Sequence, residues 1–520
     1  MKKIFLCLVL YLLLFFPNSV FAEIHTNQDF TVTYYQVRGN KERSFYPAFE
    51  LDYLYEGSID FKNPYKDYEF FGNIEYRSTD DRLVDVQDFS IERMYMGLRG
   101  EAKEFLLGDF YANFSEYSLG NALKGLKIVL GDEQTRRLIL VGGMDFSKWE
   151  DLWETRQDDS ASRKYVWGAR LENSFFDKKL SLNFNYGGAR DDLAYVSSSA
   201  TPMQVNVFSS DLKYNINEYF TLTSEIAESF TDENIRLDEV DTKSDYALKT
   251  SLDFNHQNYN LTSTYSRLGN HFNTTGGFSS QDLETLNFDG MWFMPLNIKF
   301  THYLHLDRDN LSDTKTTTTK QINPGGKFSL RLPLDISLDL GSDLRKRFST
   351  DKSVNSQTYT HSLNINKDFR IFYSTFGYSR TIVNDEVSPS AERKTDTYSL
   401  GLDGDFNIKE VRFSWNISED INHDHYKEVN EADTSLNTSL GLKAIFPSTL
   451  TFDAKISLGD NNYYLNDTDS NTSRYYFSIS RNLKDNLSFD ITYEYKGYGY
   501  VDGDNNYSEE IMKGKLSYKF

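Results

Sequence analysis

Residues 487–495 read Leu-Ser-Phe-Asp-Ile-Thr-Tyr-Glu-Tyr, and this stretch alternates strictly between two kinds of side chain. Every odd position is apolar or aromatic, whereas the even positions carry Ser, Asp, Thr and Glu. Because successive side chains of a β-strand point to opposite faces, a period of two predicts a strand with one apolar and one polar face. The same pattern recurs at 450–458 and 411–417. We therefore expect an all-β chain from about residue 165 to the end.

Tight turns separate these strands at a regular interval of about 38 residues and alternate with longer polar loops. The turns lie near Lys178, Glu218, Gln257, Pro295, Pro333, Asp368, Asn407, Pro447 and Asp485. Each repeat holds two strands of about 12 to 15 residues, long enough to cross a bilayer at a tilt near 40°. Short turns on one side and long loops on the other are typical of bacterial outer-membrane barrels. A soluble β-repeat array is the alternative, but it would need atypical terminal repeats, and none is visible.

Eight further strands are expected upstream, at 29–37, 46–57, 67–77, 87–99, 104–115, 123–131, 135–145 and 163–176. Together with the strands that follow Lys178, they predict a closed antiparallel transmembrane β-barrel of about 26 strands, in a range of 22 to 26. An even count places both termini on the side of the short turns, the periplasmic side. Residues 23–28 before the first strand are too few for a plug domain, and we expect no loop longer than about 16 residues.

The N-terminus predicts export. Lys2 and Lys3 precede an apolar run that ends at Phe16, and residues 17–22 close with a small residue where a signal peptidase would cut. We expect residues 1–22 to be a cleaved signal peptide and residues 23–520 to be a single outer-membrane barrel domain. A membrane-helix anchor is the alternative, but the apolar run is short for one. The one cysteine, Cys7, lies in this run, so the rest of the chain must be stable without disulfides.

The composition agrees with strands that are apolar on one face only. Aromatic residues make up 15% of the chain, which contains 9 prolines, yet the mean hydropathy is −0.57. The net charge of −21 argues against a nucleic-acid partner. No later stretch approaches 18 consecutive apolar residues, which excludes helical membrane spans.

The last strand ends with Leu516, Tyr518 and Phe520 on alternate positions. This ending resembles the signal by which the outer-membrane assembly machinery recognises barrels. The chain is similar in its repeat to large, porin-like bacterial outer-membrane barrels and, distantly, to the barrels of porin–cytochrome conduits. The resemblance implies a location in the bacterial outer membrane, with outer-membrane lipid, lipopolysaccharide and the barrel assembly machinery as partners.

A barrel of this size would be roughly 50 Å across, too wide to be filled by its own side chains. Its lumen must therefore hold water, a plug or a partner. A lumen-filling periplasmic protein such as a multihaem cytochrome is one such partner, and any haem would belong to it, because this chain has no CxxCH motif. Inward positions are expected to form a polar, wetted wall of mixed charge: Asp335, Asp339, Asp343 and Arg345, Asp453 and Lys455, and Glu494 and Lys496.

Residues 87–145 differ from the rest because they alternate poorly and are dense in glycine, at Gly97, Gly100, Gly108, Gly120 and Gly125. Glycine in a strand often marks a bulge, a bend or a close backbone approach. Two interpretations of this region are possible. It curves into the lumen or forms a constriction, or it consists of ordinary strands with small residues.

No residue is assigned to catalysis, to a cofactor or to a metal. The histidines are scattered over different hairpins, and His302 and His305 are expected on opposite faces of one strand. His423 and His425 are expected in a long loop, where a solvated pair is favoured over a divalent-metal site. Residues 467–471 begin like a calcium loop, but Thr472 and Ser478 replace the required glycine and carboxylate. An acidic cluster is a candidate for bridging lipopolysaccharide phosphates through divalent cations; it consists of Asp232, Glu233, Asp238, Glu239 and Asp241.

The sequence therefore favours a non-enzymatic outer-membrane channel or sheath barrel, which carries hydrophilic solutes or a partner protein across the membrane. An outer-membrane hydrolase on a barrel scaffold and a structural or adhesive surface barrel are the alternatives.

Overall fold

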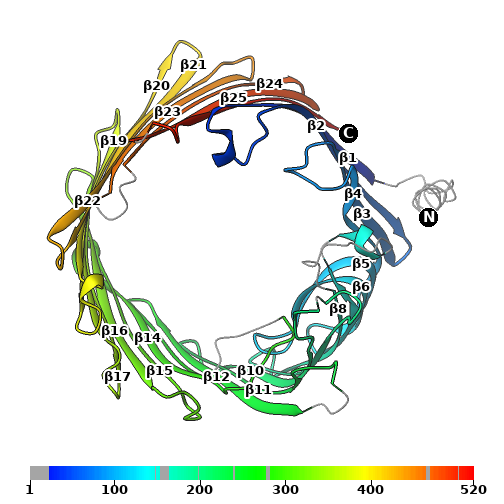
Figure 1. The fold of residues 1–520 in the computed structure, drawn as a ribbon. Coiled ribbons are helices and arrows are strands. Elements are labelled where there is room, and N and C mark those ends of the chain that lie inside the picture. The colour runs from blue at the N-terminus through cyan, green and yellow to red at the C-terminus, as the bar shows by residue number, and fades with distance from the viewer. Residues whose placement is uncertain are drawn as a thin grey trace.

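The computed structural model is one closed ring of 26 antiparallel strands, and the prediction of a closed antiparallel β-barrel of about 26 strands is confirmed (Figure 1). The structure describes residues 23–520 except 147, 153–162, 197, 238–240, 277–281, 464–468 and 502. The expected signal peptide, residues 1–22, lies outside the described residues. Within the described part of the chain, no helix is long and apolar enough to cross a membrane.

The strands follow one another around the ring in chain order. They are β1 (Glu23–Gly39), β2 (Phe49–Tyr65), β3 (Tyr68–Thr79), β4 (Phe89–Gly100), β5 (Lys103–Asn113), β6 (Gly120–Asp132), β7 (Arg136–Asp145), β8 (Lys164–Phe175), β9 (Leu180–Asp191), β10 (Gln204–Asn215), β11 (Phe220–Asp232), β12 (Thr242–His256), β13 (Tyr259–Leu268), β14 (Leu283–Met294), β15 (Ile298–Asp309), β16 (Thr319–Leu332), β17 (Ile336–Ser349), β18 (Asn355–Asp368), β19 (Tyr373–Asp385), β20 (Arg393–Ile408), β21 (Val411–Tyr426), β22 (Glu431–Ile445), β23 (Leu450–Asn462), β24 (Ser470–Lys484), β25 (Leu487–Tyr500) and β26 (Tyr507–Lys519). Short 3-10 turns lie at η1 (Lys41–Arg43), η2 (Trp149–Leu152), η3 (Pro295–Asn297) and η4 (Pro389–Ala391).

The ring closes between the first and the last strand. β1 pairs with both β2 and β26, and the backbone N–H of Thr26 donates to the carbonyl of Phe520 at 2.7 Å while Phe520 donates back at 2.9 Å. Lys515 on β26 adds an ion pair to Asp29 on β1 at 2.9 Å. The seam therefore leaves no free edge on β1 or β26, so the backbone groups there are paired even where no water is available.

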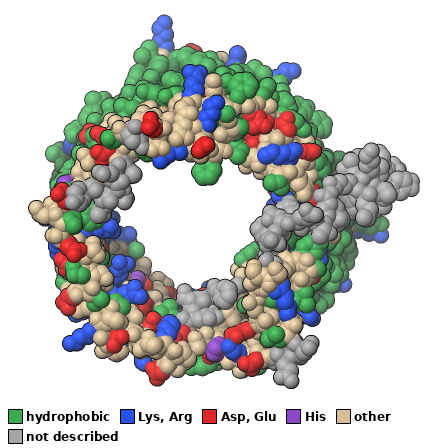
Figure 2. All heavy atoms as spheres, in the orientation of Figure 1, with side chains coloured by type: hydrophobic (Ala, Val, Ile, Leu, Met, Phe, Trp, Pro, Cys, Tyr) green, Lys and Arg blue, Asp and Glu red, His purple; other side chains and the backbone are tan. Residues whose placement is uncertain are grey.

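The two faces of the wall differ as the alternation predicts. Figure 2 shows hydrophobic side chains gathered on the outside of the ring, and polar and charged side chains on its rim and inside. On β25 the apolar face points outward, where Ile491 is 47% exposed. A belt of this kind is what a membrane-spanning barrel presents to lipid.

The expected turns and strands lie within a few residues of the observed ones, with three corrections. β1 begins at Glu23, so residues 23–28 belong to the wall and do not precede it. The connection between β7 and β8 runs from 146 to 163, longer than the expected limit. Asp335 lies in the turn before β17, in the left-handed region with φ 56°, and not on the strand. The observed strands extend farther than periodicity alone indicates, because pairing with a neighbouring strand continues into polar sequence.

Candidate functional site in the lumen

The hairpin of β5 and β6 leaves the wall halfway along its length. β4 pairs with β5 only up to Tyr95 opposite Gly108, and β6 pairs with β7 only from Lys124 opposite Met144. Beyond these positions the two strands of the hairpin pair with each other alone. We call this distal part, residues 109–123, the lumen hairpin. Figure 1 shows the segments of this region gathered inside the ring beside β5, β6 and β8.

Two glycines allow the hairpin to leave. Gly108 has φ +116°, and a Cβ there would lie 2.2 Å from the carbonyl oxygen of Met94. A Cβ on Gly125 would lie 2.1 Å from the carbonyl oxygen of Gly142 on β7. At both positions one backbone crosses another too closely for any side chain. Of the two readings left open for the glycine-rich stretch, the structure supports the one in which it curves into the lumen.

A partly buried carboxylate holds the root of the hairpin. Asp109 accepts the backbone N–H of Met94 at 2.6 Å, a donor that a continuing β5 strand would otherwise have paired. It also accepts the indole N–H of Trp149 at 2.6 Å and pairs with the Lys124 ammonium at 2.6 Å. The ammonium in turn lies 5.5 Å from the ring centroids of Phe146 and Trp149. The Asp109 carboxylate thus satisfies the backbone donor that the departing strand leaves open, and Lys124 balances its charge.

One face of the lumen hairpin is apolar and packs on the inner side of the wall. Its side chains form a buried cluster with residues of β3, β7, β8 and β9: Phe71, Leu106, Phe110, Ala112, Phe114, Leu119, Leu123, Val141, Val166 and Ala189. Glycine makes room for this packing, because a Cβ on Gly168 of β8 would lie 2.7 Å from the Phe114 ring. The opposite face is open, and Tyr111 on it is 63% exposed. The hairpin therefore narrows the lumen from one side and is held in place by its close packing against the wall.

The tip of the lumen hairpin crosses the inner face of β10, β11 and β12. The hydroxyl oxygens of Ser115 and Ser209 lie 3.1 Å apart, and the backbone N–H of Tyr117 donates to the Glu225 carboxylate at 3.2 Å. Glu116 pairs with Lys249 at 2.6 Å. Each contact reaches one strand farther along the wall. The hairpin is thus pinned along its whole length, and not only at its root.

A second inward segment covers the tip. It follows β13, and its described part, residues 269–276, places the fully buried ring of Phe272 5.6 Å from the ring of Tyr117. The Thr275 hydroxyl donates to the carbonyl of Ser118 at 2.9 Å. Both segments close over small apolar residues of the wall: Val205, Val207, Ala227 and Ala247. Here the inward face of the barrel is apolar, contrary to the polar wall expected, because loops exclude water from it.

The segment between β1 and β2 also turns inward, as the dark blue trace inside the ring of Figure 1 shows. Tyr46 stacks on Tyr35 at a centroid distance of 5.2 Å, and Ser44 donates to Glu509 on β26 at 2.7 Å. Tyr35 in turn donates to Asp81, in the connection between β3 and β4, at 2.8 Å. The inward-turned segments named here all lie before residue 277.

From β15 to β26 the lumen wall is mainly polar, as expected. Asp339 pairs with Lys327 at 3.0 Å, and Glu494 lies 2.5 Å from Arg474 and 3.7 Å from Lys496. A polar hollow of about 390 Å³ follows this wall, and its lining includes Ser418, Asp420, Ser439, Ser457, Thr472 and Arg474. Another, of about 540 Å³, lies at the short-turn end beside Asp403, Asp405, Lys443 and Asp453. Both offer hydroxyl, carboxylate and cationic groups to a polar solute.

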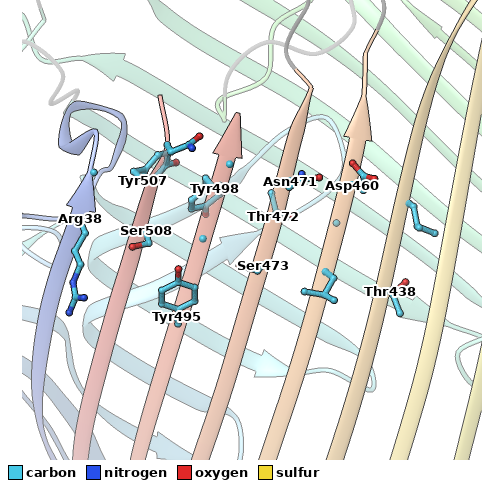
Figure 3. Close-up of a pocket in the computed structure, with 17 residues that line it drawn as sticks. Arg38, Thr438, Asp460, Asn471, Thr472, Ser473, Tyr495, Tyr498, Tyr507 and Ser508 are labelled. Atoms are coloured by element: carbon cyan, nitrogen blue, oxygen red, sulfur yellow. The ribbon is translucent and has the colours of Figure 1, made fainter. Parts of the chain in front are cut away.

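A wider depression of about 740 Å³ crosses β22 to β26 near the long loops (Figure 3). Its lining includes Leu458, which is 49% exposed, and Tyr495, both on the apolar outward face of their strands. Gly497 and Ser473 stand where larger side chains would fill it. We therefore place this depression on the outward surface and not in the lumen.

The three residues of the expected assembly signal lie on the outward side of the closing seam. Leu516 is 46% exposed, Tyr518 is 40% exposed and Phe520 is 74% exposed. The terminal backbone is tied to β1 through Thr26. Their role as an assembly signal stays a prediction.

The histidines are not brought together. His302 and His305 face opposite sides, as predicted: His302 stacks on Phe300 at 5.2 Å, and His305 lies 2.9 Å from Asp289. The expectation that His423 and His425 lie in a long loop is wrong, because both belong to β21. The hairpin of β21 and β22 continues past them to a turn of four residues, so their polar sequence is strand and not loop.

No metal centre emerges from the described residues, where no group of three or more His, Cys, Asp and Glu side chains could hold a metal ion. In the acidic cluster, Glu233 pairs with Lys243 at 2.5 Å, while Asp238 and Glu239 lie outside the described residues. Of the calcium-like stretch that begins at 467–471, residues 467 and 468 lie outside the described residues, and residues 470–478 belong to strand β24 and not to a loop. Neither cation proposal gains support here.

Comparisons with known proteins give no family and, among solved structures, only distant similarities. No protein-family model and no curated protein matches the chain. The siderophore receptor PirA from Pseudomonas aeruginosa superposes with a TM-score of 0.41 and 9% identity, over 96% of this chain and 80% of that one. The copper transporter OprC superposes with a TM-score of 0.43 and 8% identity, over 95% of this chain and 80% of that one. OccAB3 from Acinetobacter baumannii superposes with a TM-score of 0.28 and 10% identity, over 96% of this chain and 100% of that one. At such values, what each of these proteins carries remains a property of that protein.

Proposed function

We propose that the chain forms a non-enzymatic channel in the bacterial outer membrane, which passes hydrophilic solutes through a lumen narrowed on one side by the lumen hairpin. The observation that carries the proposal is the open passage along the axis of the ring in Figure 2, bounded by a largely polar wall and surrounded by an apolar exterior. An apolar belt partitions the barrel into lipid, and a wetted polar wall lowers the barrier for a hydrophilic passenger.

The wall composition points to small polar solutes without one preferred charge. Cationic and anionic side chains are interleaved along it, as in the pairs of Lys327 with Asp339 and Arg474 with Glu494. Mixed signs at close range cancel much of the field that would otherwise select for one ion. We expect conductance for cations and anions alike, with weak selectivity.

Planar-bilayer recording of the purified, full-length protein tests the proposal. The expected result is stepwise conductance that is ohmic at low voltage, with a small reversal potential across a salt gradient. Insertion of folded protein without any conductance would overturn it. Folding is checked independently by the shift of the unheated band on a denaturing gel.

We propose, as a second candidate, a sheath around a periplasmic partner such as a multihaem cytochrome. The observation that favours it is the arc of wall from β15 to β23, opposite the lumen hairpin, along which none of the described inward segments named above lies and on which a folded partner could lie. Co-purification of a haem-staining protein with the barrel would support the sheath. A barrel that conducts ions and retains no partner would contradict it.

A further inference from the structure

Three cationic side chains gather on the outward face of neighbouring strands, close to the long loops. They are Arg308 on β15, Lys320 on β16 and Lys346 on β17, and we call them the basic row. Lys320 and Lys346 lie an even number of residues from Phe328 and Leu340, which pair across the same two strands and are each 44% exposed in the apolar belt. Because side chains two residues apart on a strand share a face, the basic row faces away from the lumen.

The basic row brings like charges together. Arg308 stands directly opposite Lys320 in the ladder of β15 and β16, and Lys346 stands opposite Ile322, two residues along β16 from Lys320. Side chains directly opposite each other have Cβ atoms about 5 Å apart, and like charges in this position are destabilising. Within the described part of the chain, no carboxylate forms an ion pair with any of the three cations. The repulsion between them is therefore not offset by a close partner.

One acid on the same face does not cancel this charge. Glu284 on β14 stands opposite Arg308, but its carboxylate accepts the Tyr265 hydroxyl at 2.7 Å. It also stands opposite a fourth cation, Arg267 on β13, whose guanidinium lies 5.5 Å from the ring centroid of Tyr246. These four cations face one carboxylate, so a surplus of positive charge remains on this part of the outward face.

Another outward group shows how the chain balances such charges within itself. On β19 and β20, Arg380 and Lys394 both pair with the carboxylate of Asp396, at 2.7 and 3.2 Å. Among the described residues, the basic row has no equivalent of Asp396. Unbalanced cations at a surface that faces lipid cost stability, and such a cost is expected where the anion that balances them is a ligand.

The height of the basic row matches that of lipid head groups. At about 3.4 Å per residue and a tilt near 40°, the wall rises about 26 Å from Ile298, the first residue of β15, to Arg308. The apolar band of a transmembrane barrel is about 25 Å tall. The cations thus stand at the edge of the band, and the surface continues toward its centre with Ile322 and Leu340, which are 37% and 44% exposed.

We propose that the basic row binds the phosphate of a lipid in the membrane leaflet on the side of the long loops. The phosphate accepts hydrogen bonds from Arg308 and Lys320 and offsets their repulsion, while the acyl chains lie on the apolar surface around Ile322. Charge complementarity favours a phosphate over an uncharged head group. The apolar surface directly beside the cations favours a lipid over free phosphate. The inference does not depend on solute flow along the barrel axis.

Native mass spectrometry of the full-length barrel in detergent micelles, with EDTA present, measures the binding. The probes are phosphatidic acid, diacylglycerol with the same acyl chains, and inorganic phosphate. We expect phosphatidic acid to bind, and Arg308→Gln with Lys320→Gln to weaken its affinity about tenfold or more. The exchange of Arg308→Lys with Lys320→Arg keeps both charges and should retain binding. The matched control is Arg345→Gln with Arg347→Gln, which removes two cations beside Lys346 on the lumen face of β17 and should leave the affinity unchanged.

Charge reversal gives a second readout that needs no lipid. Lys320→Glu places a carboxylate opposite Arg308, so it should raise the midpoint of thermal unfolding in lipid-free micelles and at the same time weaken the binding of phosphatidic acid. A lowered midpoint would contradict the uncompensated repulsion on which the proposal rests.

Three binding results would overturn the proposal. They are an equal loss of affinity in the lumen-face control, binding of diacylglycerol as tight as that of phosphatidic acid, and displacement of phosphatidic acid by an equal concentration of inorganic phosphate. The last result would assign the cations to a free anion. The binding needs only the folded barrel, and the ion conductance of the parent protein is recorded separately. A failure of the channel is therefore distinguishable from a failure of the lipid site.

Discussion

The ammonium of Lys124 lies 2.6 Å from the carboxylate of Asp109 at the point where the lumen hairpin leaves the wall. The two side chains are 7% and 15% exposed, so either one alone would be an uncompensated charge in a protein interior. The pair therefore fixes where the hairpin departs. It also makes the root of the hairpin sensitive to the loss of either charge.

Replacement of Lys124 by Met should lower the free energy of unfolding by about 3 kcal/mol or more, because Asp109 is left buried without its cation. The double variant with Asp109→Asn should recover part of this loss. Urea titration in detergent micelles, followed by tryptophan fluorescence, measures both. A single variant within about 1 kcal/mol of the parent would mean that water already reaches the pair.

Substitution of Gly125 should be far more damaging than substitution of Gly142, although the two lie on neighbouring strands. A Cβ on Gly125 would lie 2.1 Å from a carbonyl oxygen, whereas a Cβ on Gly142 meets nothing within 4 Å. Gly125→Ala is expected to cost on the order of 1–3 kcal/mol through overpacking, and Gly142→Ala less than about 1 kcal/mol. Thermal unfolding of the two variants compares them directly. Equal losses would contradict the close backbone crossing.

The tip of the hairpin should depend on its apolar contacts more than on its ion pair. Leu119 is 1% exposed, and Leu119→Ala should cost about 2–5 kcal/mol. Glu116, whose pair with Lys249 is half-exposed, should lose less than about 1 kcal/mol on replacement by Gln. Hydrogen exchange at residues 109–123 gives the local effect. Faster hydrogen exchange at residues 109–123 in Glu116→Gln than in Leu119→Ala would contradict this ranking.

The ion pair between Lys148 and Asp85 should survive mild acid. Burial would raise the pKa of Asp85, but hydrogen bonds from Lys148 and Ser90 outweigh burial and hold the pKa below its ordinary value of 3.8. A carboxyl group with a lowered pKa contributes its full stabilisation above that ordinary value and loses it as the pH falls through the folded-state pKa. The stability difference between the parent and Asp85→Asn should therefore be constant from neutral pH down to about pH 4 and shrink below it. A difference that vanishes already near pH 6 would contradict the assignment.

The wall of this barrel was predictable because its determinants are local. The alternation at 487–495 and the turns near Lys178 and Pro295 each follow from a few neighbouring residues, and the observed strands match them. The lumen hairpin was only half predictable. Glycine density at Gly108 and Gly125 indicated an unusual backbone, but the surface against which it packs is set by contacts distant in sequence, such as Ser115 with Ser209.

One signal in the sequence could have indicated that surface. Inward positions of β10 to β12 are apolar at Val205, Val207, Ala227 and Ala247, where a wetted lumen wall would be polar. Small apolar residues on the polar face of a strand indicate that something covers them. Periodicity alone does not give the partner, since either a loop of the same chain or another protein would produce the same pattern.

Modification of a cysteine at position 111 during bilayer recording tests the central claim most directly. Tyr111 lies on the open face of the lumen hairpin, and Phe208 lies on the outward face of β10; they are 63% and 53% exposed. In the Cys7→Ser background, a water-soluble, charged methanethiosulfonate should reduce the conductance of Tyr111→Cys and leave that of Phe208→Cys unchanged. No response at position 111 in channels that do conduct, or an equal response at position 208, would contradict an open lumen narrowed by this hairpin.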